Sequence, residues 1–285
     1  MRKFYIITNE HKDKDLVVTQ EIRDYIVSQG GECDYFVSRE ANWHTEGVRR
    51  PGAIPEDVEC IIVLGGDGTL VRAARDLADL DIPMIGVNLG TLGYLCELER
   101  STVLAAIDKL FHDEYDVEQR MLLEGCEIRN EQFATVTQAL NDIVIHRIGS
   151  LQLINLEVCV NGEYLTTYGA DGIIISTPTG STGYSMSAGG PIVDPKADLI
   201  VITPINSHDI SSKSIVVGSD ANITIELVQR RAEKDELAEV SFDGDRIIHM
   251  QVGDKILVRK AEKGTKILKL NRVSFLQILR KKMQH

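Results

Sequence analysis

The segment that most constrains the fold is Cys60-Ile-Ile-Val-Leu-Gly-Gly-Asp-Gly-Thr69, an apolar run that ends in a glycine-rich turn. Its first five residues are apolar without alternation, which is typical of a central parallel strand covered on both faces. Beyond Thr69 the apolar residues recur with helical spacing, so Thr69 is predicted to be the N-cap of a helix. The segment therefore predicts the strand, turn and helix of an α/β domain.

The turn has two interpretations. Gly65, Gly66 and Gly68 let the backbone approach a bulky anion, and the predicted helix places the positive end of its dipole beside them. A tight turn without a ligand fits the same residues, because Asp and Gly are common in turns. Asp67 would repel a phosphate unless it binds a metal or handles a proton. Since no Lys-Ser or Lys-Thr pair and no Gly-x-Gly-x-x-Gly pattern is present, the functional interpretation is a phosphate loop without lysine.

The surrounding segments extend this α/β pattern. Strands are predicted over residues 3–8, 32–37 and 83–88, and helices over 19–29 and 101–112, with Ser101 as the cap of the second helix. The segment 38–57 has no clear period, and it is interpreted either as a loop that covers a substrate or as a variable surface excursion. The first part of the chain is therefore predicted to be a Rossmann-like domain with a parallel sheet.

The pattern changes near Arg120. From Met121 to about Lys260 the chain consists of short segments rich in Val, Ile, Leu and Thr, separated by turn signals such as Asn-Gly and Asp-Gly. This part is predicted to be mainly antiparallel β. A final helix is predicted within residues 271–283.

The composition argues against several classes of function. A net charge of −12 disfavours nucleic acid or an anionic membrane as a partner, so an anionic substrate would need local positive groups or a metal. No apolar run reaches membrane-spanning length, and the N-terminus passes directly into a strand, which favours a cytoplasmic location. The five cysteines are odd in number and scattered, so neither a disulfide framework nor a zinc site is indicated.

A second unusual segment covers residues 171–191. A buried strand over 172–176 is followed by a dozen residues that are nearly all small, hydroxylated or glycine. Such a segment can wrap a ribose or a base closely, and Tyr184 would add an aromatic face or a hydroxyl donor. A Ser/Thr-rich surface loop is the alternative, and a serine nucleophile at Ser181 is a weaker one because the Gly-x-Ser-x-Gly pattern is missing.

Two pairs of polar residues lie between apolar runs. Asn141 and Asp142 mark a kink that is either a plain turn or a pair that exchanges hydrogen bonds with ribose hydroxyls. Asp243 and Gly244 are predicted to form a type I′ hairpin turn.

Together these motifs resemble the NAD kinase family. The resemblance rests on the segments 65–69, 88–94, 141–142, 171–172, 177–184, 187–191 and 241–244, which occur in the order of the family and cover most of the chain. The Gly-Gly-Asp-Gly signature is shared with lipid kinases and phosphofructokinases, whereas Thr177-Pro-Thr-Gly-Ser-Thr182 is far more specific.

The resemblance implies an α/β domain of residues 1–120 plus 262–285, to which the last helix returns, and a β-rich NAD-binding domain of residues 121–261. It also implies ATP-dependent phosphorylation of the 2′-hydroxyl on the adenosine ribose of NAD, in a homodimer or homotetramer. Mg²⁺ or another divalent cation would be carried mainly by the phosphate donor, without dedicated metal ligands in the chain. Polyphosphate as the donor, NADH as an acceptor and feedback by NADP or NADPH stay open.

The resemblance further implies roles for individual residues. Asp67 would orient the 2′-hydroxyl and accept its proton. The phosphates would lie beside Gly65, Gly66, Gly68, Thr69 and Arg72. NAD would contact Tyr94, Asn141, Asp142, Asp171, Thr179, Thr182, Gly183, Tyr184 and Ser187.

The chain departs from the family at two of these positions, because Glu is common where Asp142 stands and Ala is common where Gly183 stands. Two alternatives to an NAD kinase are a lipid kinase of the same superfamily and a non-catalytic sensor that binds NAD or NADP.

Overall fold

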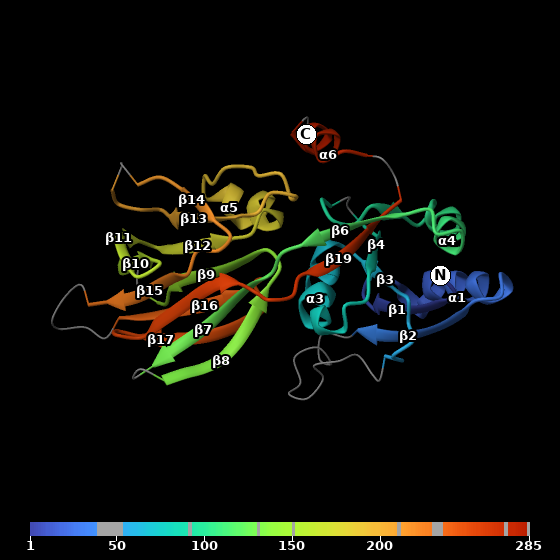
Figure 1. The fold of residues 1–285 in the computed structure, drawn as a ribbon, viewed down its shortest axis with the longest axis horizontal. Helices are drawn as coiled ribbons and strands as arrows, with labels where there is room; N and C mark the ends of the chain where they lie inside the picture. Colours follow the sequence, from blue (N-terminus) through green and yellow to red (C-terminus); the bar gives the residue numbers. More distant parts are fainter. Residues whose placement is uncertain are drawn as a thin grey trace. The chain divides into compact units, whose positions relative to one another are not determined.

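The computed structural model describes residues 1–38, 54–90, 93–129, 132–149, 152–209, 212–229, 236–270 and 273–283. Its internal contacts divide the chain into two compact units. Unit 1 comprises Met1–Gln119 and Thr265–His285, and unit 2 comprises Arg120–Gly264. Each unit is described separately below, with the element labels of Figure 1.

Unit 1 has an α/β architecture. Its strands are β1 (Lys3–Asn9), β2 (Glu32–Ser38), β3 (Cys60–Gly65), β4 (Met84–Asn88), β5 (Leu98–Glu99), β6 (Asp116–Arg120) and β19 (Thr265–Lys269). Its helices are α1 (Val17–Ser28), α3 (Asp67–Asp76), α4 (Val103–Phe111) and α6 (Phe275–Met283), with short 3₁₀ turns η1 (Lys14–Leu16) and η2 (Ala78–Leu80). The described strands form a seven-stranded sheet in the order β2-β1-β3-β4-β19-β6, with β5 paired to β4. The pairs among β1, β2, β3 and β4 are parallel, so the predicted Rossmann-like sheet is confirmed.

Strand β3 lies inside this sheet, between β1 and β4, and all six of its residues are buried. Cys60, Ile62 and Leu64 pack in the same apolar cluster as residues of α1 and α4. Ile61 and Val63 alternate with them and are buried at the other face, which α3 covers (Figure 1). Burying one such aliphatic side chain contributes about 1.5–3 kcal/mol, so a strand covered on both faces is a strong anchor for the turn that follows it.

Two predicted helix caps are wrong. Helix α3 begins at Asp67 with Gly66 as its N-cap, because the extended backbone of Gly66 lets the helix start directly after the strand. Thr69 therefore lies within the first turn of α3. Helix α4 is capped at Thr102 and not at Ser101, and the Thr102 hydroxyl accepts a hydrogen bond from the backbone N–H of Glu99 at 3.1 Å.

Unit 2 consists mainly of antiparallel strands. They are β7 (Leu123–Arg129), β8 (Gln132–Ala139), β9 (Asp142–Arg147), β10 (Ile154–Val160), β11 (Glu163–Ala170), β12 (Gly172–Ser176), β13 (Leu199–Ile205), β14 (Ile215–Gly218), β15 (Ile223–Val228), β16 (Leu237–Phe242), β17 (Arg246–Gln251) and β18 (Lys255–Lys260). The short helical elements are η3 (Thr179–Thr182) and α5 (Tyr184–Ser187). The described strands form two six-stranded sheets, in the orders β11-β10-β15-β18-β7-β8 and β14-β13-β12-β9-β16-β17.

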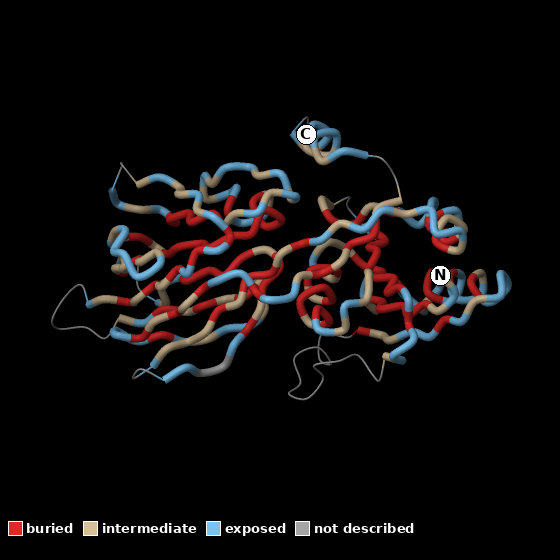
Figure 2. Tube along the Cα trace, in the orientation of Figure 1, coloured by how far each residue is buried: buried red, intermediate tan, exposed pale blue. Residues whose placement is uncertain are grey.

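One continuous apolar core joins the two sheets of unit 2. It includes Leu156 and Val158 of the first sheet together with Ile143, Ile173 and Val240 of the second, all of them buried. The buried positions alternate with partly buried ones along several strands, as Figure 2 shows by alternating colours. This alternation is the period of strands with one face on a core, so the predicted antiparallel β character is confirmed.

Three other predictions concern turns and termini. Asp243 and Gly244 have φ values of 53° and 70°, and Asp245 donates its backbone N–H to the Phe242 carbonyl, so the predicted type I′ turn is confirmed. Most of the predicted loop 38–57 lies outside the described residues. The predicted terminal helix is present as α6 from Phe275, although the expected start at 271 lies outside the described residues. None of the helices in the described ranges is long and apolar enough to cross a membrane.

Candidate functional site

The carboxylate of Asp67 lies at the glycine turn after β3 and is held by three backbone N–H groups. Its Oδ2 atom accepts hydrogen bonds from Tyr94 at 2.5 Å and Leu95 at 3.2 Å, and its Oδ1 atom accepts one from Cys96 at 3.0 Å. Asp67 also occupies the first turn of α3, where the helix dipole favours a negative charge. The backbone N–H groups of residues 94–96 and the first turn of α3 therefore both hold this carboxylate in place.

The loop that holds Asp67 is itself constrained. A Cβ atom at Gly93 would lie 2.0 Å from the Asp67 carboxylate, so only glycine fits there. Burial and the charge of Asp67 together raise the pKa of the Cys96 thiol, which stays protonated. Glu97 follows directly, and its carboxylate accepts the backbone N–H of Leu270 at 3.2 Å and faces the ammonium of Lys269 at 3.6 Å. The loop around Asp67 is thus tied to the segment at the end of β19.

The remaining predicted phosphate residues follow one another along the same turn. Gly65 ends β3, Gly66 caps α3, and Gly68 and Thr69 lie in its first turn. Arg72 lies five positions beyond Asp67 and is partly buried.

Tyr94 contributes its backbone N–H to Asp67, and its ring has a second neighbour. The ammonium of Lys282 on α6 lies 5.0 Å from the centroid of the Tyr94 ring, which is a cation–π distance. The predicted contact of this ring with adenine stays a prediction.

In unit 2, the chain bends at Leu140 and Asn141 between β8 and β9, and the carboxylate of Asp243 holds the bend. It accepts hydrogen bonds from the backbone N–H groups of Leu140 at 2.9 Å, Asn141 at 2.7 Å and Asp142 at 3.3 Å. The backbone N–H of Asp243 in turn donates to the Asp142 carbonyl at 3.0 Å. Asp243 therefore positions the predicted pair in addition to forming its hairpin turn, a role that the sequence analysis missed.

Asp142 is a buried acid, with 6% of its surface exposed. Burial raises its pKa to about 7, and the nearby negative charge of Asp243 acts in the same direction. The carboxyl group is therefore shared between its protonated and ionised forms near neutral pH. A buried acid with a strongly raised pKa is a frequent property of functional sites.

The segment after β12 folds back against this bend. The Thr177 hydroxyl donates to the Leu140 carbonyl at 2.6 Å and accepts the backbone N–H of Gly180 at 3.0 Å. A Cβ atom at Gly180 would lie 2.1 Å from the Asn141 carbonyl oxygen, so the two segments approach as closely as a glycine allows. The structure thus brings the segment from Thr177 to Gly180 against Leu140 and Asn141.

The rest of the segment is anchored and partly open to solvent. The buried Ser181 hydroxyl bonds to the backbone of Val193 in both directions, at 3.2 Å to its carbonyl and 3.0 Å from its N–H. Ser181 is therefore a structural residue, and the segment is not a free surface loop. Thr182 is partly buried, whereas Gly183, Tyr184 and Ser187 are exposed and available to a ligand.

Asp171 is separated from these residues. Strands β9 and β12 pair from Gly172 with His146 to Ser176 with Asp142, so Asp171 and Asp142 lie at opposite ends of the ladder, about 17 Å apart at 3.4 Å per residue. Asp171 accepts hydrogen bonds from Asn206 at 3.0 Å and from Arg147 at 2.6 Å, and these bonds hold its pKa below the ordinary value. Within this unit the structure does not bring Asp171 next to the other predicted NAD residues.

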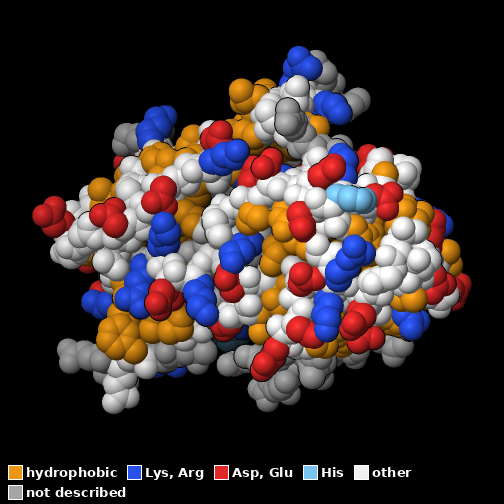
Figure 3. Space-filling view, turned by 45° about the vertical axis from the view of Figure 1, so that its right-hand side comes forward, with side chains coloured by type: hydrophobic (Ala, Val, Ile, Leu, Met, Phe, Trp, Pro, Cys, Tyr) orange, Lys and Arg blue, Asp and Glu red, His pale blue; other side chains and the backbone are white. Residues whose placement is uncertain are grey.

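The described part of the chain contains no group of three or more His, Cys, Asp or Glu side chains that could hold a metal ion. Figure 3 shows acidic and basic side chains interspersed over the visible face, so the negative charge is not gathered in one patch among the described residues there.

Comparisons with known proteins match both halves of the chain. Residues 5–115 match the model of the ATP-NAD kinase N-terminal domain, and residues 140–270 match the model of the ATP-NAD kinase C-terminal domain. The NAD kinase of Agathobacter rectalis is 54% identical over 284 residues, which cover 99% of each chain. The NAD kinase of Lachnoclostridium phytofermentans is 43% identical with the same coverage.

Two solved structures share the fold. Yeast NADH kinase complexed with NADH superimposes with a TM-score of 0.84 at 24% identity, covering 99% of this chain and 88% of that one. An NAD kinase from Archaeoglobus fulgidus in complex with ATP superimposes with a TM-score of 0.78 at 22% identity, covering 99% of this chain and 98% of that one.

Proposed function

Because this chain belongs to the NAD kinase family and is an enzyme of that family, we propose that it transfers the terminal phosphoryl group of ATP to the 2′-hydroxyl of the adenosine ribose of NAD. The products are NADP and ADP. The observation that supports this reaction most directly is the carboxylate of Asp67, fixed by three backbone N–H groups at a glycine turn.

We assign to Asp67 the orientation of the substrate hydroxyl. An ionised carboxylate only accepts hydrogen bonds, so Asp67, whose position is fixed by three backbone N–H groups, would accept the bond from the 2′-hydroxyl. As the hydroxyl oxygen bonds to the terminal phosphorus, the bond from that phosphorus to the bridging oxygen breaks and the proton passes to Asp67. Phosphoryl transfer has a loose transition state, so positioning and neutralisation of charge matter more than a strong base.

The phosphates are assigned to the glycine turn. The backbone N–H groups at the start of α3 and the positive end of its dipole favour anions beside Gly66 and Gly68. Thr69 and Arg72, which lie on the same helix, are also assigned to phosphate binding.

Mg²⁺ fits this site only if the phosphates of the substrate supply most of its ligands. Mg²⁺ is commonly bound by one or two carboxylates together with substrate phosphates and water. The glycine turn offers one carboxylate, Asp67, and both of its oxygens already accept backbone hydrogen bonds. The triphosphate would therefore hold the ion, which would supply neutralisation of phosphate charge.

The NAD side of the reaction is assigned to unit 2. Asn141 and Asp142 would bind the adenosine ribose, and the raised pKa of Asp142 lets its carboxyl group donate or accept a hydrogen bond near pH 7. Five neighbours would contact the rest of the dinucleotide: Thr179, Thr182, Gly183, Tyr184 and Ser187. Tyr94 beside adenine, Asp171 at the far end of β12, the homodimer or homotetramer and the cytoplasmic location stay predictions.

The test measures NADP formation from NAD, ATP and Mg²⁺ through an NADP-specific dehydrogenase. Asp67→Asn is expected to lower turnover at least a hundredfold, since removing a positioned acid–base group costs about 10²–10⁴ in rate. Asp24→Asn makes the same change on the exposed face of α1 and should retain full activity.

Circular dichroism and NAD titration accompany the assay, because the amide of the Asp67→Asn variant would face backbone N–H donors and could loosen the 94–96 loop. Full activity of a folded Asp67→Asn variant would refute the assigned role. A folded wild-type protein that binds NAD without turnover would favour polyphosphate as the donor, and next the non-catalytic sensor. Turnover of a lipid alcohol in place of NAD would favour the lipid kinase.

A further inference from the structure

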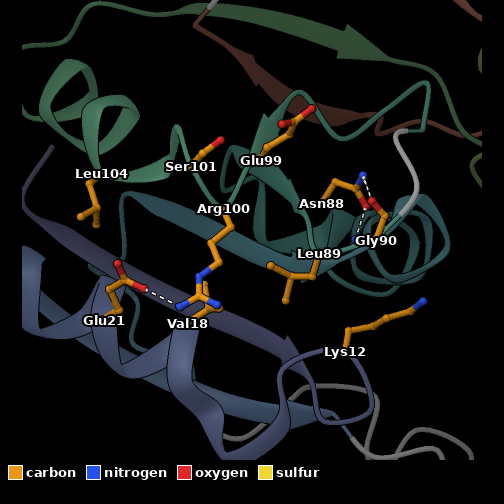
Figure 4. Close-up of a pocket in the computed structure, with 10 residues that line it drawn as sticks. All are labelled: Lys12, Val18, Glu21, Asn88, Leu89, Gly90, Glu99, Arg100, Ser101 and Leu104. Atoms are coloured by element: carbon orange, nitrogen blue, oxygen red, sulfur yellow. Dashed lines mark hydrogen bonds and ion pairs between the residues drawn. The ribbon is translucent and has the colours of Figure 1, made fainter.

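The two sides of the proposed reaction are built differently. In unit 1, a cavity of about 690 Å³ adjoins the glycine turn, because Leu89 lines it and donates its backbone N–H to the Gly65 carbonyl at 2.8 Å (Figure 4). This cavity is part of the phosphate side. In unit 2, the NAD side rests on a bend of three residues, 140–142, between β8 and the start of β9. The backbone of this bend is held by residues that lie far away in the sequence.

Two neighbouring strands bring Thr177 and Asp243 to the bend. Strand β9 pairs with β12 on one side and with β16 on the other. The last residue of β12 is the register partner of Asp142, and the last residue of β16 is the register partner of Ile143. The residues that follow these strands, Thr177 and Asp243, therefore lie beside the bend from opposite sides.

Together these two residues satisfy the whole backbone of the bend. The Asp243 carboxylate accepts the N–H groups of residues 140, 141 and 142 at 2.9, 2.7 and 3.3 Å. The Thr177 hydroxyl donates to the Leu140 carbonyl at 2.6 Å, and the Thr177 backbone N–H donates to the Asn141 carbonyl at 2.9 Å. The backbone N–H of Asp243 donates to the Asp142 carbonyl at 3.0 Å. All six backbone polar groups are thus bonded within the protein, so the bend offers a ligand its side chains.

The side chains of the bend are directed toward the segment assigned to the dinucleotide. A Cβ atom at Gly183 would lie 3.9 Å from the Oδ2 atom of Asp142. Because Gly183 is exposed, a ligand on this segment would lie next to the Asp142 carboxyl group. None of the bonds that hold the backbone of the bend uses this carboxyl group or the side-chain amide of Asn141.

We propose that Asp243 and Thr177 are positioning residues for NAD, which fix the direction of the Asn141 and Asp142 side chains by holding the backbone that carries them. The inference rests on the proposed kinase function and adds to it the residues that set the affinity for NAD. Neither residue is assigned a contact with NAD. A loosened bend has to be ordered by NAD itself, so if about one molecule in ten has the native bend, the apparent Kd for NAD rises about tenfold.

Two variants loosen the bend in different ways. Asp243→Asn keeps the hairpin, because Asn-Gly is a favoured pair for a type I′ turn. Its side-chain amide replaces one carboxylate oxygen with a donor, so at least one N–H of the bend loses its acceptor. Thr177→Val keeps a similar shape and removes the hydroxyl that donates to Leu140. It leaves every charge in place, so an effect common to both variants does not come from the lost charge of Asp243.

Both variants are expected to raise the KM for NAD by about tenfold or more and to leave the KM for ATP within about twofold. Thr177→Ser retains the hydroxyl and should recover most of the loss. Asp220→Asn makes the same charge change as Asp243→Asn at an exposed turn between β14 and β15, and it should match the wild type. A purely structural role would lower the folded fraction, and with it kcat, without changing either KM. An unchanged KM for NAD in the folded variants, or an equal rise for NAD and ATP, would overturn the proposal.

Calorimetric titration with NAD alone separates this proposal from the kinase function itself. Weaker binding of NAD by both variants than by the wild type supports the positioning role whether or not the protein forms NADP. Equal binding refutes the positioning role even if the wild type forms NADP. Thermal melting identifies the variants that are folded at the assay temperature, and Thr177→Val decides alone if Asp243→Asn is not.

Discussion

Asp142 provides a test of how burial controls the charge of the NAD-side pair. Its carboxyl group is buried in unit 2 beside Asp243, and its pKa is raised to about 7 from an ordinary value of 3.8. Asp142→Asn replaces this acid with a neutral group of nearly the same shape. We expect the variant to be more stable than the wild type at pH 8 and to differ much less from it at pH 4.

The size of the effect follows from the pKa. One pKa unit corresponds to about 1.4 kcal/mol, so the rise from 3.8 to about 7 corresponds to a free energy of about 4 kcal/mol. Below pH 4 the carboxyl group is protonated in both the folded and the unfolded chain and contributes no difference. Between pH 4 and pH 7 the unfolded chain loses the proton while the folded chain keeps it, so the free energy of unfolding falls, and above pH 7 it levels off.

The assay is urea unfolding followed by circular dichroism at pH 4, 5, 6, 7 and 8. The stability of the variant relative to the wild type should increase over this range by up to about 4 kcal/mol. Asp171→Asn is the control of opposite sign, because the pKa of Asp171 is lowered by its bonds from Asn206 and Arg147. That variant should be less stable than the wild type from pH 8 down to pH 5, and an added measurement at pH 3 should show a smaller difference.

A stability difference between Asp142→Asn and the wild type that is the same at pH 5 and at pH 8 would refute the reasoning. Such a result would mean that Asp142 ionises in the folded chain as readily as in the unfolded chain. The raised pKa would then have no part in NAD binding either.

Two further predictions concern packing, one beside Asn141 in unit 2 and one beside the Asp67 loop in unit 1. Gly180→Ala should destabilise the chain by about 3 kcal/mol or more, because its Cβ would lie 2.1 Å from the Asn141 carbonyl oxygen. Gly183→Ala should be tolerated, because the closest contact of its Cβ would be 3.2 Å. Thermal melting of both variants checks this difference. Glu97→Gln should lower the free energy of unfolding by about 3 kcal/mol, since it leaves Lys269 without its buried partner. Glu97→Leu combined with Lys269→Met should recover most of that loss in urea unfolding, and an equal loss in the double variant would contradict the pairing.

The strands that position the site could be predicted from the sequence because their signals are local. The run Cys60–Leu64 is apolar without interruption and glycines end it, so both the burial of β3 and the turn after it are encoded within ten residues. The same holds for β12, which covers 172–176 as predicted and passes into small and hydroxylated residues. Burial on both faces and a change of backbone direction each leave a pattern in consecutive residues.

The partners of the functional groups could not be predicted, because they lie far away in the chain. The three N–H groups that hold Asp67 come from residues 27 to 29 positions later, and Asp243 reaches Asn141 across 102 positions. Backbone N–H groups have no residue signature, so no pattern marks such a loop. The glycine at position 93 is the sequence feature that reflects this contact, because any side chain there would clash with the Asp67 carboxylate.

Helix starts were mispredicted for a related reason. Thr and Ser are common N-caps, which favoured Thr69 and Ser101. The N-cap position is instead an extended glycine before α3 and Thr102 before α4, and the Thr102 hydroxyl makes no hydrogen bond to the helix. The register of β9 and β12 adds what the sequence does not show, namely that Asp171 and Asp142 lie at opposite ends of one ladder.

Strand β19 has a consequence for how the chain is made. It joins the sheet of unit 1 beside β4, although 176 residues separate the end of β4 at Asn88 from Thr265. During synthesis from the N-terminus, unit 2 is complete before β19 leaves the ribosome, so unit 2 can fold while unit 1 still lacks an interior strand. Until then the Met84 end of the buried strand β4, which β5 does not pair, has an open edge, the kind of surface that pairs with other chains. We expect nascent chains stalled before residue 265 to depend on chaperones, and the glycine turn to become rigid only when translation is nearly finished.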